Sequence, residues 1–165
     1  MLDVSSNIQL EAALPKVESP HAAIEILGAG VTRQWLYDYH IVTYTILDVT
    51  RESVDTWIEG AKQGSRVWKP DQTICILYDF GSARHLSRTP YLTSRLGELT
   101  KLRSGSPTFS AIILADTFFG KLVAQTTHFY FQSVTRVATK IEVFYNRQSG
   151  LNWLIKQGAI RHISD

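Results

Sequence analysis

The stretch Ile74–Tyr78 reads ICILY and is an uninterrupted apolar run. Strands of a parallel sheet are covered on both faces, so they lack the alternation that marks a strand with one wet face. Phe109–Ala115 and Ile141–Tyr145 continue the series, and helical patterns separate the three runs. Strands joined through helices pair in parallel with right-handed crossovers. The stretch and its two successors therefore predict an α/β domain.

The helical patterns lie between and beyond these strands. In the first, apolar residues recur at i, i+3, i+4 and i+7, which is one face of a helix, at Val54, Trp57, Ile58 and Ala61. Thr50 is its expected N-cap, and Gly64 and Pro70 are expected to stop it. Three more helical segments follow. The first has Thr89 as its N-cap and Pro90 at its first position, and the second is Phe118–Val134. The third has Asn146 as its N-cap and Gly158 at its C-terminal end. We therefore expect about four helices.

Towards the N-terminus, three shorter segments alternate polar and apolar residues, at Ile24–Ile26, Val31–Tyr37 and His40–Leu47. Between the first two, Gly28–Gly30 (GAG) predicts a tight turn, because glycine adopts positive φ without steric cost. A second turn is expected near Asp38–Tyr39. The pattern is typical of antiparallel strands at a sheet margin with one face partly wet.

These elements combine into one layered α/β domain over residues 22–158, with a mixed sheet that has an antiparallel N-terminal part and parallel βα units. Residues 1–21 are expected to form a flexible arm, since Pro15 and Pro20 punctuate a segment without a clear period. Residues 159–165 are expected to be a C-terminal tail. A length of 165 residues suits one domain rather than two.

Composition narrows the class of protein. Seventeen Lys and Arg against fifteen Asp and Glu give a net charge of +2, which argues against a dedicated nucleic-acid binder. A single cysteine, Cys75, excludes an internal disulfide and a cysteine-based zinc site. The most apolar window, 108–124, contains Asp116 and Lys121 and is too short and interrupted to span a membrane. We expect a cytoplasmic protein.

No set of residues forms a coherent catalytic or metal site. Gly28 and Gly30 begin a dinucleotide-like pattern, but Arg33 stands where the third glycine belongs, so a hairpin turn is the better interpretation. Asp79, Ser82 and His85 are the residue types of a hydrolase triad, yet no G-x-S-x-G elbow surrounds Ser82. We expect Asp79 and Ser82 to satisfy turn amides instead. The five histidines do not have the spacing of metal ligands, and no cofactor is expected. These histidines are His21, His40, His85, His128 and His162.

The loop between Asp79 and Tyr91 is the candidate binding edge. It follows a buried strand and precedes a helix N-terminus, where α/β folds place ligands and where amides favour anions. Its candidate binding residues are Asp79, Ser82, Arg84, His85, Arg88 and Thr89. Arg95, Lys101 and Arg103 extend the positive charge along the next helix, which would suit an anionic ligand or an acidic partner. Ser87 and Thr89 are the candidate phosphorylation sites.

An excess of aromatic residues lies in Phe118–Val134, more than one sheet face needs. This surplus would line a lipophilic pocket or meet a second subunit. Together with Trp35 and Tyr37, expected at the sheet margin, it predicts a homodimer.

The order of the C-terminal elements resembles the SpoIIAA-like branch of the STAS-like proteins, the fold of bacterial anti-sigma-factor antagonists, which is related to CRAL-TRIO lipid-exchange domains. The likeness covers roughly residues 23–157 and rests on Ile76–Phe80 (ILYDF), on Ala111–Ala115 (AIILA) followed by Phe118–Leu122 (FFGKL), and on Val143–Arg147 (VFYNR) followed by Gly150–Leu154 (GLNWL).

The resemblance implies a STAS-like fold and a non-enzymatic binding or regulatory module, which acts through a protein partner or a small anionic or amphipathic ligand. A small-ligand or lipid carrier with an apolar pocket is the alternative, and a hydrolase is a distant third. The chain departs from the family at two places. Gly150 stands where the family commonly has Ala, and the Asp-Ser-x-Gly stretch with the phosphorylated serine is absent, Ser87–Pro90 lying near its place.

Overall fold

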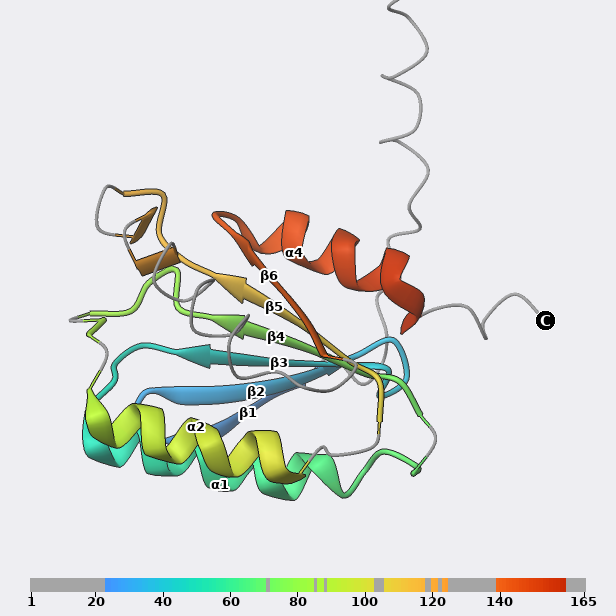
Figure 1. Cartoon of the computed structure of the whole chain (residues 1–165), viewed down its shortest axis with the longest axis horizontal. Coiled ribbons are helices and arrows are strands. Elements are labelled where there is room, and N and C mark those ends of the chain that lie inside the picture. The colour runs from blue at the N-terminus through green and yellow to red at the C-terminus, as the bar shows by residue number, and fades with distance from the viewer. Residues whose placement is uncertain are drawn as a thin grey trace, which may run out of the picture.

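The computed structural model describes residues 23–70, 72–84, 86–87, 89–102, 106–117, 120–121, 123–124 and 139–159 (Figure 1). Its strands are β1 (Ile24–Gly28), β2 (Val31–Leu36), β3 (Ile41–Ile46), β4 (Ile74–Asp79), β5 (Thr108–Ile113) and β6 (Thr139–Phe144). Its helices are α1 (Arg51–Ser65), α2 (Pro90–Leu102) and α4 (Arg147–Leu154), which a wider π-type turn, η2 (Ile155–Ala159), continues.

One six-stranded sheet runs through the described residues, with its strands in chain order from β1 to β6. β1 pairs with β2 and β2 with β3 in antiparallel fashion, whereas β3, β4, β5 and β6 are parallel. The mixed sheet of one α/β domain is therefore confirmed, with strand ends within about two residues of the expected ones. The expected third helix, Phe118–Val134, and the two terminal segments lie almost entirely outside the described residues.

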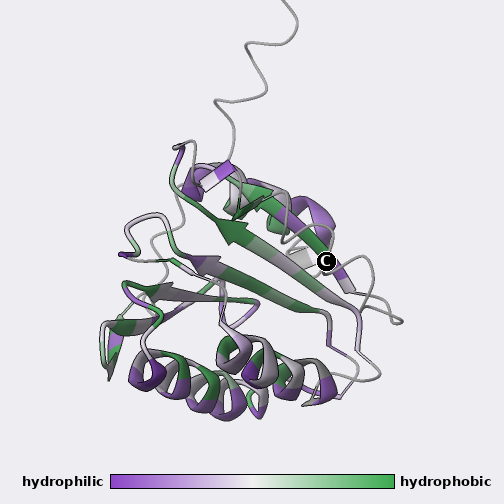
Figure 2. Cartoon of the chain, turned by 60° about the vertical axis from the view of Figure 1, so that its left-hand side comes forward, coloured by the Kyte–Doolittle hydropathy of each residue, from purple (hydrophilic) through white to green (hydrophobic). Residues whose placement is uncertain are grey.

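Helices cover both faces of the sheet, so the domain has three layers (Figure 1). α1 and α2 pack side by side over one face, and α4 lies on the other against β4, β5 and β6. Figure 2 shows apolar residues along the strands, while polar residues mark the outer sides of the helices. The larger apolar cluster lies beneath α1 and includes Val42, Trp57 and Ile76, and the smaller one lies beneath α4 around Leu77 and Leu154.

α1 forms where the sequence predicts it. The Thr50 hydroxyl accepts the Ser53 amide at 3.2 Å, which satisfies one of the free donors of the first turn. All four residues of the predicted apolar face are buried. The helix ends at Ser65, between the two residues expected to stop it, and Gly64 lies in its last turn. A Cβ there would lie 2.6 Å from Tyr44 Oη, so this glycine allows the helix to approach the sheet closely.

The helix caps expected at Thr89 and Asn146 are present. Thr89 Oγ1 accepts the amide of Leu92 at 3.1 Å, and Asn146 Oδ1 accepts that of Ser149 at 2.8 Å. At the far end, Gly158 takes φ of 123°, a positive value outside the helical region.

The two N-terminal turns differ in their chemistry. Gly28, Ala29 and Gly30 all have positive φ, as the GAG sequence indicates. In the second turn three consecutive non-glycine residues, Tyr37, Asp38 and Tyr39, take φ of 52°, 50° and 67°. The expectation that the second strand includes Tyr37 is therefore wrong, because the chain leaves the extended conformation after Leu36.

No helix in the described part of the chain is long and apolar enough to span a bilayer.

Candidate functional site

The loop after β4 is held by its backbone. Phe80 N–H donates to Ile113 O at 2.9 Å, and Ala83 N–H donates to Phe80 O at 3.0 Å. Arg84 N–H then donates to Leu47 O at 2.9 Å, which joins this loop to the segment that leaves β3. Because β3, β4 and β5 are parallel, these contacts gather at the carboxyl edge of the sheet.

Asp79, the last residue of β4, accepts hydrogen bonds from two partners. Its Oδ1 accepts the Gly81 amide at 2.9 Å, so the predicted role in the turn is confirmed. Its Oδ2 accepts a charge-assisted hydrogen bond from Arg147 Nη1 at 3.1 Å. The Asp79 side chain is 17% exposed and that of Arg147 is 34% exposed. The carboxylate is therefore neutralised by a cation that the sequence did not single out.

Arg147 connects four elements. As the first residue of α4 it places a cation at the positive end of the helix dipole, which is unfavourable by itself. Its guanidinium offsets this by reaching back over the sheet, where Nη2 donates to Gln34 Oε1 at 3.2 Å and to Thr43 Oγ1 at 3.1 Å. Arg147 thereby holds α4 to β2, β3 and β4. No local signal in the sequence gives these partners, the nearest of which is 68 positions away.

The triad of Asp79, Ser82 and His85 gains no support from this arrangement. Both Asp79 oxygens are engaged, and among the described residues no hydrogen bond joins Asp79 to Ser82. Ser82 is exposed, and so are Arg84 and Ser87. His85 and Arg88 lie outside the described residues.

The two candidate phosphorylation sites have different surroundings. The Thr89 hydroxyl serves as the helix cap, and its carbonyl accepts the Thr93 hydroxyl at 3.1 Å. Ser87 is exposed on the loop. A modifying enzyme would therefore reach Ser87 without breaking a cap.

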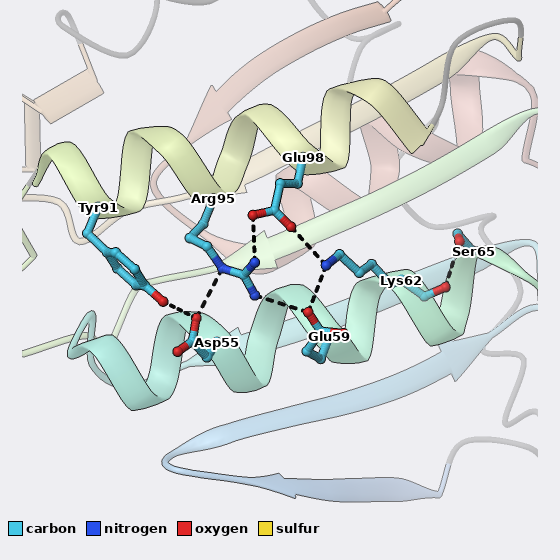
Figure 3. Close-up of polar contacts among 7 residues, drawn as sticks. All are labelled: Asp55, Glu59, Lys62, Ser65, Tyr91, Arg95 and Glu98. Carbon is cyan, nitrogen blue, oxygen red and sulfur yellow. Dashed lines mark hydrogen bonds and ion pairs between the residues drawn. The ribbon is translucent and has the colours of Figure 1, made fainter.

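The positive charge expected along α2 is neutralised at Arg95. Its guanidinium lies between α1 and α2, where it meets Asp55 at 3.0 Å, Glu59 at 3.0 Å and Glu98 at 2.6 Å (Figure 3). Lys62 Nζ also contacts Glu59 at 2.7 Å and Glu98 at 2.8 Å. We call these five residues the α1–α2 seam. Three carboxylates surround two cations, so Arg95 is paired within the domain.

The ionisation of the seam follows from these contacts. Hydrogen bonds from Lys62 and then Arg95 lower the pKa of both Glu59 and Glu98. The hydrogen bonds to Glu59 and then Glu98 raise the pKa of Lys62. Tyr91 Oη donates to Asp55, and the Arg51 guanidinium lies 4.6 Å from the Tyr91 ring centroid. The seam is a mutually neutralised cluster that fastens α2 to α1.

On the α4 side of the sheet, the margin at β1 is exposed. Ile24 and Ile26 lie opposite Gln34 and Thr32, and therefore share the face that carries Thr43. Ile24 is 64% exposed and Ile26 is 83% exposed. The alternation in the sequence indicated a partly wet face, but it did not show that these two isoleucines face water.

Trp35 was expected at the same margin as part of a subunit contact. It points to the other face, packs against Trp68 with ring centroids 5.2 Å apart, and is 4% exposed. Tyr37 packs at the edge of the smaller apolar cluster. Trp35 is thus a core residue.

No family model, no curated protein and no solved structure matches this chain.

Proposed function

We propose that this protein is a non-enzymatic, STAS-like binding or regulatory module, which engages a protein partner or a small anionic ligand through the loop after β4. The observation that carries the proposal is the exposure of Ser82, Arg84 and Ser87 on a loop whose backbone is hydrogen-bonded to β5 and to Leu47, which follows β3. Backbone that hydrogen bonds already hold, as at Phe80, Ala83 and Arg84, loses little conformational entropy when it binds. Binding residues are commonly carried on loops that a rigid scaffold positions.

Arg84 is the residue most suited to contact an anion. Its backbone is paired with Leu47 while its side chain is exposed, and no ion pair is recorded for it among the described residues. Guanidinium groups bind phosphate and carboxylate in a bidentate manner. Asp79 does not compete for Arg84, because Arg147 already neutralises it.

A small anionic ligand is tested with inorganic phosphate as the probe. Backbone amide shifts of residues 80–89 are followed by NMR in the parent protein and in Arg84→Ala. The matched control is Lys69→Ala, which removes an exposed cation before β4 begins. The proposal expects saturable shifts in the parent and in the control, and a loss of saturation in Arg84→Ala.

A protein partner is tested by photo-crosslinking in cells. A photoreactive amino acid replaces Ser82 in one variant and Lys69 in the control. The proposal expects a discrete adduct from position 82 alone. If position 82 gives no adduct and phosphate gives no saturable shift, the loop is only a connection. Hydrolysis of a p-nitrophenyl ester that is lost in Ser82→Ala would instead favour the hydrolase.

A further inference from the structure

β1 is the end strand of the sheet as described, with β2 as its only partner (Figure 1). An end strand presents a row of N–H and C=O groups on its outer side, ready to pair with another strand. Soluble proteins commonly block such edges with lysine, proline or a free charge. β1, with the sequence IEILG, has neither lysine nor proline.

The single charge on β1 is already neutralised. Glu25 lies directly opposite Arg33, whose Nε and Nη2 donate to Glu25 Oε2 at 3.0 and 2.6 Å. Arg33 Nη1 also donates to Gly60 O at 3.1 Å, which anchors the guanidinium against α1. A carboxylate on an incoming strand would therefore face an ion pair rather than an unpaired carboxylate.

The other face of β1 carries Ile24 and Ile26. These are the two most exposed large apolar side chains recorded in the described part of the chain, and they stand side by side on one strand. β-branched residues pack well as direct cross-strand pairs. The strand therefore combines a backbone edge that no described strand covers, a neutralised charge and an apolar pair.

We propose that β1 pairs in antiparallel fashion with β1 of a second copy, around a two-fold axis at Glu25. An antiparallel pair of identical strands is two-fold symmetric, and its surfaces are then self-complementary. In this register Ile24 lies opposite the partner's Ile26, and Ile26 opposite the partner's Ile24. On the other face the two Glu25 side chains lie directly opposite each other, and each is neutralised by the Arg33 of its own copy, which offsets the repulsion between the carboxylates.

The geometry also sets the expected strength of this contact. β1 is five residues long, so the pair buries less area than a standard stable interface. Dimerisation should therefore depend on concentration. This inference is independent of the proposed binding loop, because β1 and that loop involve different residues, and either can fail alone.

The first test is sedimentation equilibrium of the full chain. The parent is expected to move from 18.6 kDa towards twice that mass as its concentration rises. Ile26→Lys places a charge on the edge and should weaken the dimer by about tenfold or more. The control is Val67→Lys, an equally drastic change at a side chain that is 49% exposed and follows α1. It should leave dimerisation unchanged.

The second test fixes the register. Ile24→Cys and Ile26→Cys are oxidised separately and as an equimolar mixture. The mixture should give far more disulfide-linked dimer than either variant alone, because directly opposite Cβ atoms lie about 5 Å apart. Cys75 does not interfere, since it is buried and burial raises the pKa of its thiol to about 12. A monomeric parent, or an Ile26→Lys variant that dimerises like the parent, overturns the proposal, and a mixture that crosslinks no better than its components overturns the register.

Discussion

A single arginine determines how the polar end of the sheet is arranged. Arg147 neutralises Asp79, and it satisfies Gln34 and the buried hydroxyl of Thr43. Burying a polar group lowers the stability of the fold unless the group is hydrogen-bonded. The cation at the start of α4 is thus explained by the groups beneath it rather than by the helix it begins.

Arg147→Ala should lower the free energy of unfolding by about 1–2 kcal/mol, because Asp79 and Thr43 lose a hydrogen-bond partner while solvent already screens part of the pair. Arg147→Lys should recover only part of this, since an ammonium group cannot reach three acceptors in one plane. Urea denaturation measures both variants against Arg66→Ala, a change at an exposed residue. An Arg147→Ala variant as stable as the control would show that the contacts contribute nothing.

Within single helices and turns, the sequence predicts the features that hydrophobic periodicity and capping residues determine. The buried face of α1, the GAG turn and the caps at Thr89 and Asn146 are all local patterns, and all are confirmed. The pairing of Arg147 with Asp79 and of Arg95 with Glu59 joins distant segments. Such pairs depend on tertiary packing, so a single sequence gives no signal for them.

Gly150 shows how packing overrides helix propensity. It lies within α4, where alanine would be favoured by about 1 kcal/mol. A Cβ there would lie 2.6 Å from Ile113 Cδ1, a side-chain tip in the smaller apolar cluster. The glycine therefore allows α4 to lie close to β5.

Gly150→Ala should give no stabilisation in the parent, because the contact with Ile113 cancels the gain in propensity. In an Ile113→Val background, which removes Cδ1, the same change should stabilise by up to about 1 kcal/mol. Gly97→Ala in α2 is the matched control, since no atom lies within 4 Å of a Cβ built there, and it should stabilise in both backgrounds. Thermal and urea unfolding of the four Gly150 and Ile113 combinations measure the coupling. Equal effects of Gly150→Ala in both backgrounds would contradict this account.

The α1–α2 seam should make the stability of the fold decrease at acidic pH. The folded-state pKa values of Glu59 and Glu98 lie below 4.5, the ordinary value. Their contribution is therefore present above about pH 4.5, and it is lost as the pH falls through the folded-state values. Glu59→Gln with Glu98→Gln should flatten the fall of the melting temperature in this range. Glu142→Gln, at an exposed carboxylate on β6, should leave the slope unchanged, and a double variant with the parent's slope would rule out the seam as its source.

In the described part of the chain, helices cover the two faces of the sheet unequally. α1 and α2 lie together over one face, whereas α4 is the helix that packs on the other face among the described residues. The larger cluster therefore has support from two helices. Among the residues that the structure describes, the smaller cluster lies between the strands β3, β4 and β5 and one helix of eight residues, α4, with its continuation in η2.

Leu154 should consequently be a critical core residue. It is completely buried at the end of α4, against the cluster that contains Leu77 and Ile113. Leu154→Ala should lower the free energy of unfolding by about 2–5 kcal/mol, because it leaves a cavity that a short helix cannot close by moving. Leu96→Ala, at a partly buried residue of α2, should cost less. Hydrogen exchange then separates local from global effects. Exchange in 147–154 should rise more than exchange in α1 when Leu154 is replaced, and a uniform rise in both would show that the two layers unfold as one unit.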